Sequence, residues 1–262
     1  MKITAILCVR NELPYLRDVL PYLAGEDINV ALIDNGSTDG TLEAVRRGDF
    51  PNVVHTEPFP YSGSFDLSRQ LEMKWALAKS LASHWVIHQD ADEILHGPTR
   101  WGGLRHHIEQ ADSRGFNVLN FNELVMLPAD PSRDDMLHNN SNYYFFEPKP
   151  MRLMRAWKRS ANLAAGTSGG HTLQGDVNVY PERMILKHFI VRNQEHAYEK
   201  YLDRNFSTAD LRKGWHRNRL NFTVDNLRIP TSSEHLHSLA SPLDVPERLP
   251  RSTRTHFWEW EP

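Results

Sequence analysis

Residues 85–93 of the chain read WVIHQDADE, a short apolar run that passes directly into three carboxylates. A run of this length with β-branched and aromatic residues predicts a buried strand at residues 85–88, and the acidic residues follow its end. In open α/β sheets, ligands bind beyond this end of the strands. The same kind of apolar run predicts strands at residues 2–9, 30–33, 52–56 and 116–121.

Helical patterns fill the intervals between these predicted strands. Further helices are predicted at residues 12–23, 41–47 and 100–114, and the clearest one covers residues 64–83. Strands and helices in strict turn predict an α/β fold with a doubly wound, mostly parallel sheet. The apolar stripe of the clearest helix, at helical spacing, consists of Leu67, Leu71, Trp75, Ala78 and Ala82.

The pattern changes after residue 125. Residues 128–150 are polar and rich in Pro and Asn, which predicts a long loop, and residues 151–190 resemble a series of short strands. A helix is predicted at 195–213, and an irregular tail with several prolines follows it. We therefore expect one domain at residues 1–194, with a helical C-terminal extension and tail at 195–262 as part of the same unit.

The composition of the 262-residue chain is that of a globular protein, with 40% hydrophobic and 24% charged residues. Its 30 Lys and Arg residues and 33 Asp and Glu residues give a formal net charge of −3, which argues against general nucleic-acid binding. The single cysteine, Cys8, cannot build a disulfide framework or a cysteine-based zinc site. No apolar stretch approaches the roughly 18 residues of a membrane span, so we expect no transmembrane segment and a cytoplasmic location.

Polar loops follow three of the predicted strands. They are Arg10-Asn11-Glu12, the loop from Asp34 to Gly40, and Asp90-Ala91-Asp92-Glu93. Because parallel strands end at the same edge of a sheet, we expect these loops to lie together, where paired carboxylates can share a hard divalent cation. Taken singly, the loop at Asp34 also suits a turn or a helix cap, and Asp90 and Asp92 also suit a solvated strand end.

These loops, in this order, resemble the family 2 glycosyltransferases with the GT-A fold. The resemblance covers roughly residues 2–125 and rests on CVRNE, IDNGSTDGT, SRQLEMKWAL and VIHQDADEIL. It implies a nucleotide-diphosphate sugar donor, most simply a UDP- or GDP-sugar, held with Mn²⁺ or Mg²⁺. By this resemblance Asp34 binds the nucleobase, Asp90 binds the ribose or the metal, and Asp92 is the principal metal ligand. The other donor-binding residues implied by it are Arg10, Glu12 and Arg69.

The second half resembles a subgroup of small bacterial members of that family. The matching segments are SGGHTLQG and LKHFIVRNQEHAYEKYLDR. The resemblance implies that His188 completes the metal site and that Arg192 and Lys200 contact the diphosphate. His171 is a candidate contact to the acceptor or to the transferred sugar. From the residues alone, a strand-end histidine bonded to the backbone and a solvated helix face with Arg192 and Lys200 remain open.

The catalytic base has no motif to identify it. No Glu-Asp dipeptide follows the Asp90-Ala91-Asp92 loop, where processive family members carry one, and their Gln-x-x-Arg-Trp motif is also missing. An inverting transfer needs a carboxylate or an imidazole to deprotonate the acceptor hydroxyl, and the candidates are Asp176, Glu123 and His171.

The sequence therefore predicts a metal-dependent, inverting, hexosyltransferase-like enzyme with an unknown acceptor. Two alternatives stay open: a nucleotidyltransferase and a catalytically inactive carbohydrate-binding protein of the same fold. A nucleotidyltransferase would require a glycine-rich basic loop after the first strand, and Arg10-Asn11-Glu12 is not one.

Overall fold

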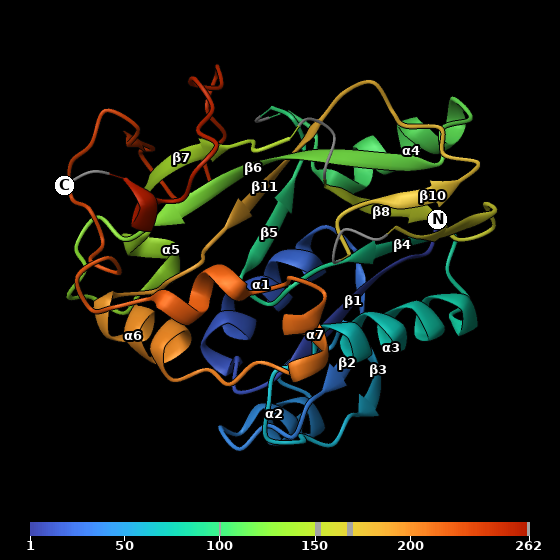
Figure 1. Cartoon of the computed structure of the whole chain (residues 1–262). Helices are drawn as coiled ribbons and strands as arrows, with labels where there is room; N and C mark the ends of the chain where they lie inside the picture. The colour runs from blue at the N-terminus through green and yellow to red at the C-terminus, as the bar shows by residue number, and fades with distance from the viewer. Residues whose placement is uncertain (100, 150–152, 167–169, 261–262) are drawn as a thin grey trace.

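A ten-stranded sheet, with helices packed on it, forms the framework of the described chain (Figure 1). The computed structural model describes residues 1–99, 101–149, 153–166 and 170–260. A separate two-stranded ribbon pairs β9 with β10. The strands are β1 (Ile3–Val9), β2 (Asn29–Asp34), β3 (Val53–Pro58), β4 (Trp85–His88), β5 (Glu93–His96), β6 (Val118–Leu127), β7 (Asn142–Phe146), β8 (Met154–Lys158), β9 (Leu163–Ala165), β10 (Leu173–Gly175), β11 (Met184–His188) and β12 (His237–Ser238).

Local sequence signals explain where several helices begin and end. Pro14 occupies the first turn of α1, where its missing N–H costs nothing. The Asp66 carboxylate accepts the N–H of Arg69 and caps α3, and α2 ends at Gly48, whose φ of 83° suits glycine. The helices are α1 (Leu13–Gly25), α2 (Thr41–Arg47), α3 (Leu67–Ser80), α4 (Leu104–Ser113), α5 (Met136–Asn139), α6 (Gln194–Leu202) and α7 (Thr208–Arg212), with 3₁₀ turns at Arg217–Asn221 and Phe257–Glu259.

The first half of the sheet is parallel. Its strand order is β3-β2-β1-β4, and all three pairings run parallel, so that Val9 at the end of β1 lies beside Asp34 at the end of β2. The predicted α/β class, with a Rossmann-like parallel half, is confirmed. The loops after β1, β2 and β4 consequently lie at one edge of the sheet.

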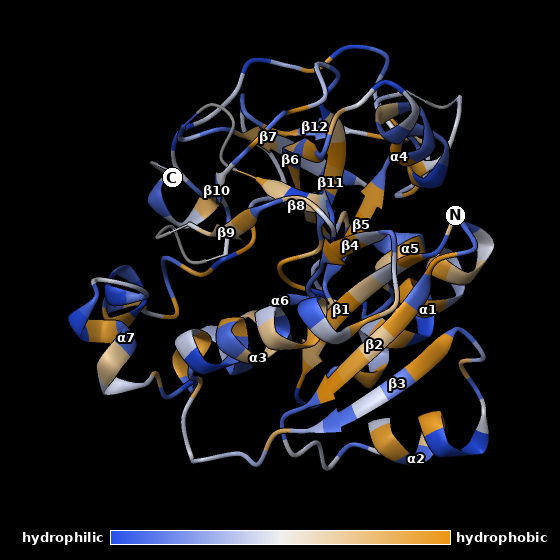
Figure 2. Ribbon diagram, turned by 90° about the vertical axis from the view of Figure 1, so that its right-hand side faces the viewer, coloured by the Kyte–Doolittle hydropathy of each residue, from blue (hydrophilic) through white to orange (hydrophobic). Residues whose placement is uncertain are grey.

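Helices cover both faces of this half of the sheet, and β1 has side chains that pack on each face. Leu7 packs in one apolar cluster with Leu20 of α1, while its neighbour Ile6 packs in another cluster with Leu77 of α3. β1 and β2 are accordingly hydrophobic along most of their length, whereas β3, at the edge of the sheet, is paler (Figure 2). This two-sided burial is what a continuous apolar run predicts.

Beyond β4 the sheet becomes mixed. β8 lies between β4 and β6 and is antiparallel to both, and β7 and β12 extend the sheet with further antiparallel pairings. β11 is parallel to β6 and antiparallel to β5, a strand that was not predicted. The loop prediction for residues 128–150 is wrong in part, since α5 and β7 lie within it; the aromatic residues of β7 are buried against the sheet.

The single helix predicted at 195–213 is also wrong, because the structure breaks it into α6 and α7. Between them the chain runs past the start of α3: Phe65 N–H donates to Asn205 O at 2.7 Å, and Ser207 N–H donates to Phe65 O at 2.9 Å. These backbone hydrogen bonds replace those of a continuing helix. The domain boundary at residue 194 stays a prediction. In the described part of the chain, no helix combines the length and the apolar character needed to cross a bilayer.

A buried lysine fastens the tail to the sheet. The Lys187 side chain on β11 is fully buried, and its Nζ donates to the carbonyl oxygens of Pro242 (2.8 Å) and Asp244 (2.7 Å). Burial lowers the pKa of this amine to about 7, and the Asp244 charge offsets only part of that effect.

This lysine predicts a specific pH dependence of stability. Between pH 7 and 9 the unfolded chain holds the Lys187 proton more tightly than the folded chain, so folding stability from this group rises with pH. We expect the free energy of unfolding of the wild type, relative to Lys187→Met, to increase by roughly 2 kcal/mol over that range. Urea titrations of both proteins at pH 7, 8 and 9 measure this difference. The exposed Lys79→Met serves as control, and parallel pH curves for wild type and Lys187→Met would contradict the expectation.

Candidate active site

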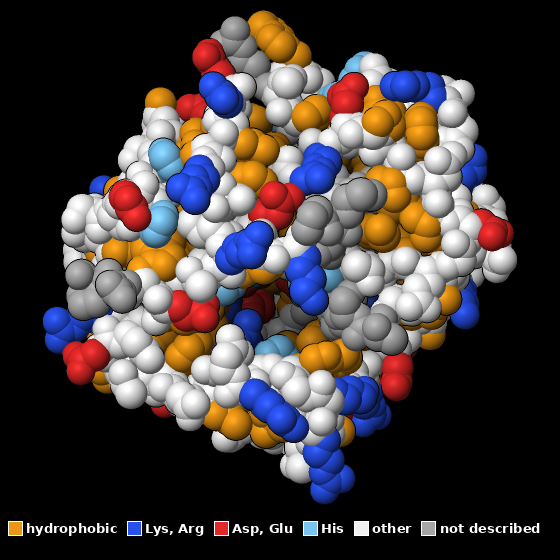
Figure 3. Space-filling model, turned by 45° about the horizontal axis from the view of Figure 1, so that its top comes forward, with side chains coloured by type: hydrophobic (Ala, Val, Ile, Leu, Met, Phe, Trp, Pro, Cys, Tyr) orange, Lys and Arg blue, Asp and Glu red, His pale blue; other side chains and the backbone are white. Residues whose placement is uncertain are grey.

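Two adjoining cavities lie at the edge where β1 and β4 end. The first, of about 250 Å³, is lined by Asp90, Asp92 and residues of the C-terminal quarter, and we call it the central cavity. The second, of about 370 Å³, is lined by Arg10 and other residues of the loops after β1 and β2, and we call it the side cavity. The molecule has a hollowed face where acidic and basic side chains lie together (Figure 3). The residues that line both cavities are Cys8, Glu12, Phe65, Gln70 and Arg204.

Asp90 is held by two buried cations. Lys74 Nζ lies 2.8 Å from its Oδ1, and Arg155 Nη2 lies 3.5 Å from its Oδ2. Arg155 also pairs with Glu93 at 2.5 Å, a contact in which both side chains are almost wholly buried. Burial alone would raise the pKa of the Asp90 carboxyl, but the charges of Lys74 and Arg155 hold it well below its usual range. Asp90 is therefore an anion at neutral pH.

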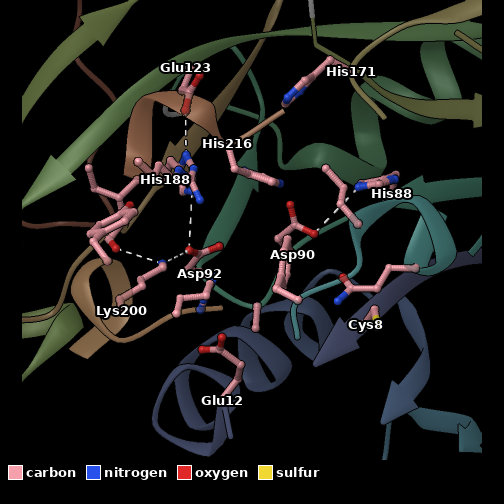
Figure 4. A pocket seen from close by; sticks show the side chains of 18 of the residues that line it. Cys8, Glu12, His88, Asp90, Asp92, Glu123, His171, His188, Lys200 and His216 are labelled. Carbon is pink, nitrogen blue, oxygen red and sulfur yellow. Dashed lines mark hydrogen bonds and ion pairs between the residues drawn. The ribbon is translucent and has the colours of Figure 1, made fainter. Parts of the chain in front are cut away.

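Asp92 forms a second group with Lys200 and His188 (Figure 4). Lys200 Nζ lies 2.6 Å from Asp92 Oδ2, and His188 Nε2 lies 3.5 Å from the same oxygen. The other ring nitrogen of His188, Nδ1, lies 2.7 Å from Glu123 Oε1. Burial disfavours a charged imidazole, but the neighbouring Asp92 carboxylate outweighs it and raises the pKa of His188. The ring of His188 therefore lies between two carboxylates, with one ring nitrogen toward Asp92 and the other toward Glu123.

Two of the predicted metal ligands, Asp90 and Asp92, are thus paired with lysines of the protein. Asp90, Asp92 and His188 all line the central cavity, but among the described residues no three His, Cys, Asp or Glu side chains gather where they could hold a metal ion. Binding of a divalent cation would require the ammonium groups of Lys74 and Lys200 to leave these carboxylates. The placed side chains therefore do not fit a preformed cation site, and Mn²⁺ or Mg²⁺ stays a prediction.

Glu12 lines both cavities, and its donor-binding role stays a prediction. Burial raises the pKa of its carboxyl to about 7, and the nearby Lys200 opposes that effect. A carboxyl with this pKa gains and loses its proton near neutral pH.

Arg10 and Asp34 shape the loop after β2. The Arg10 guanidinium donates to the carbonyl oxygens of Asn35 (3.0 Å) and Gly36 (2.6 Å) and stacks 3.4 Å above the Tyr61 ring. The Asp34 carboxylate accepts the N–H groups of Gly36 and Ser37 within the loop and is almost wholly buried. Arg10 lines the side cavity, whereas Asp34 lines neither cavity, so nucleobase binding by Asp34 stays a prediction.

Three further predicted residues lie away from the cavities. Arg69 faces the Phe59 ring at 5.1 Å, and Arg192 pairs with Asp134 through contacts of 3.0 and 2.7 Å. The Asp176 carboxylate accepts a hydrogen bond from Asn162 at 3.2 Å. None of the three lines either cavity.

The other two candidate bases, Glu123 and His171, do line the central cavity and lie across it from Glu12 (Figure 4). Part of the glycine segment before His171, including Gly169, lies outside the described residues.

Sequence reasoning missed four cations of the central cavity: Lys74, Arg155, Arg204 and Arg219. Lys74 follows Gln70 by four residues on α3, and both side chains are buried. Arg155 lies in the middle of the short strand β8. For Lys74 and Arg155, the signal in the sequence is a charged residue inside a helix or strand that is expected to be buried, because such a residue is rarely buried without a charged partner. Arg204 and Arg219 lie in irregular segments, which carry no periodic signal.

Neither the protein-family models nor the curated proteins contain a match to this chain. Solved structures of S. aureus TarS are similar to it at low identity. TarS 1-349 gives a TM-score of 0.44 and 14% identity over 84% of this chain and 74% of that one, and its complex with UDP-GlcNAc gives 0.42 and 13% over 88% and 76%. A longer TarS structure gives 0.41 and 14% over 80% of this chain, which spans only 41% of that TarS chain.

Proposed function

We propose that this protein is a glycosyltransferase that moves a sugar from a nucleotide-diphosphate donor to an acceptor hydroxyl. The observation that carries the proposal is the pair of joined cavities at the ends of parallel strands, where carboxylates and cations meet. Ligands of open α/β sheets bind at this edge. The side cavity is assigned to the nucleoside and the central cavity to the sugar, with the diphosphate between them.

In the proposed reaction the acceptor oxygen attacks the anomeric carbon, and the bond from that carbon to the diphosphate oxygen breaks. The diphosphate leaves with the electron pair, and a base takes the acceptor proton. Glu123 and His171 are the candidate bases that line the central cavity. Attack opposite the leaving group inverts the anomeric centre. Metal dependence is part of the sequence prediction; in the described structure the positive charge beside Asp90 and Asp92 comes from Lys74 and Lys200.

Nucleotide binding provides the first test. We expect one of UDP, GDP, CDP and dTDP to raise the melting temperature, because a ligand that binds only the folded state stabilises it by about 2.7 kcal/mol at a hundred times its dissociation constant. Each nucleotide is measured with Mn²⁺, with Mg²⁺ and with EDTA, which also tests the metal prediction. The matching nucleosides serve as controls. No shift with any nucleotide at millimolar concentration would contradict the proposal.

A further inference from the structure

We propose that Arg204 and Arg219 form the diphosphate-binding part of the donor site. The inference rests on the proposed function and assigns a role to two residues outside every motif. It places the charge that receives the leaving group on residues 204–219, in the lining of the same cavity as Asp90 and Asp92.

The position of Arg204 is the first observation. Arg204 lines both the central and the side cavity, and Arg219 lines the central cavity. A nucleotide sugar that spans the two cavities has its diphosphate where they join, because the diphosphate connects the nucleoside to the sugar. Arg204 therefore lies where two negative phosphates must pass.

The second observation is the charge balance of the central cavity. Three of its cations already have carboxylate partners: Lys74 with Asp90, Arg155 with Glu93, and Lys200 with Asp92. The charge of these cations is therefore largely used within the protein. They stabilise the carboxylates more than they attract an added anion.

Arg204 and Arg219 differ from those cations. In the described ranges neither forms an ion pair with a carboxylate, and both lie beside aromatic rings: Arg204 Cζ lies 5.0 Å from the centre of the Phe65 ring, and Arg219 Cζ lies 5.3 Å from that of Tyr201. Burial is the main cause that lowers the pKa of Arg219; the charge of Arg204 also lowers it, while Tyr201 and Asp92 oppose the change. An anion between them relieves both costs. A guanidinium group matches a phosphate with two parallel hydrogen bonds.

The segment that carries these arginines is fixed against α3. Besides the backbone hydrogen bonds between Phe65 and the segment 205–207, the buried Asp210 carboxylate accepts Leu67 N–H at 2.7 Å and the Ser68 hydroxyl. Asp210 thereby satisfies N–H groups at the start of α3 that have no partner within the helix. The wall of the cavity is therefore held in position before a ligand arrives, as a strong binding site requires. Arg192, the earlier candidate for this role, is instead paired with Asp134.

The test compares Arg204→Met, Arg219→Met and the double variant with wild type. Methionine keeps an apolar stem over the aromatic rings and removes the charge. Isothermal titration without metal measures binding of UDP, GDP, CDP, dTDP, their nucleosides and inorganic pyrophosphate. We expect each single variant to bind the diphosphate of the preferred base roughly tenfold to a hundredfold more weakly, with affinity for the nucleoside unchanged. Arg217→Met is the matched control, because Arg217 is exposed and donates to the Leu211 carbonyl in the same segment.

The outcomes separate this inference from the proposed function. Nucleoside diphosphate binding that is equally strong in wild type and the double variant overturns the inference and leaves the proposed function in place. Pyrophosphate binding that the variants lose, in a protein that binds no nucleotide, supports the arginine site and counts against the proposed function. Absence of both pyrophosphate and nucleotide binding in wild type overturns the arginine site, and it overturns the proposed function as well if no nucleotide binds with Mn²⁺ or Mg²⁺ either.

Discussion

Replacing Asp92 by Asn is expected to lower the rate of donor turnover by two to four orders of magnitude, roughly the effect of removing a positioned charge from an active site. Asp92 accepts from Lys200 at 2.6 Å and lies 3.5 Å from His188. Without the Asp92 charge, the Lys200 ammonium loses its carboxylate partner in the cavity, and His188 loses the neighbour that raises its pKa. The measurement is the release of nucleoside diphosphate from a nucleotide-sugar donor. The donor carries the nucleotide that raises the melting temperature in the test described under Proposed function.

Asp134→Asn is the matched control. Asp134, like Asp92, is a carboxylate in an ion pair, but its pair with Arg192 lies outside both cavities. We expect the turnover rate of Asp134→Asn to stay within about threefold of the wild-type rate. Circular dichroism and the melting temperature establish that each variant is folded. A folded Asp92→Asn protein with the wild-type rate would remove Asp92 from the mechanism.

Replacing Glu93 by Ala is expected to cost about 3–5 kcal/mol of unfolding free energy, the usual effect of leaving one member of a buried ion pair alone. Arg155 and Glu93 are almost wholly buried and lie 2.5 Å apart. The variant leaves the guanidinium with only the longer contact of 3.5 Å to Asp90. For a chain of this size the melting temperature should fall by about 10 °C. Thermal and urea unfolding measure both quantities.

Glu109→Ala provides the comparison with an exposed pair. Glu109 pairs with Arg105 at 2.8 Å along α4, and we expect its loss to cost less than about 1 kcal/mol. A double variant, Glu93→Leu with Arg155→Met, removes both buried charges and should recover much of the lost stability. Equal effects of Glu93→Ala and Glu109→Ala would show that the buried pair contributes no more than an exposed one.

The parallel half of the sheet was predictable because burial on both faces imposes continuous apolar runs. β4 begins and ends at the predicted residues, and α2 does too. The second half was harder, since β8 and β5 are short and contain charged residues. The break between α6 and α7 depends on pairing with Phe65, which is far away in the sequence and leaves no local signal.

The candidate site, like the fold, was predictable only in part. Asp90, Asp92, Glu12, His188 and Lys200 come together as their motifs indicated. The partners of these residues did not follow from the motifs, because an ion pair such as that between Lys74 and Asp90 joins a helix to a strand end. Spacing along the chain does not specify such a contact.

The contact between the Asp210 carboxylate of α7 and the start of α3 has a consequence for folding during synthesis. The chain leaves the ribosome from its N-terminus, so β1 to β4 and α3 are complete long before residues 204–219 are made. During that time the first turn of α3 lacks its partner, and the central cavity lacks the wall that carries Arg204 and Arg219. A nascent chain therefore lacks the proposed diphosphate-binding arginines until residues 204–219 have been translated.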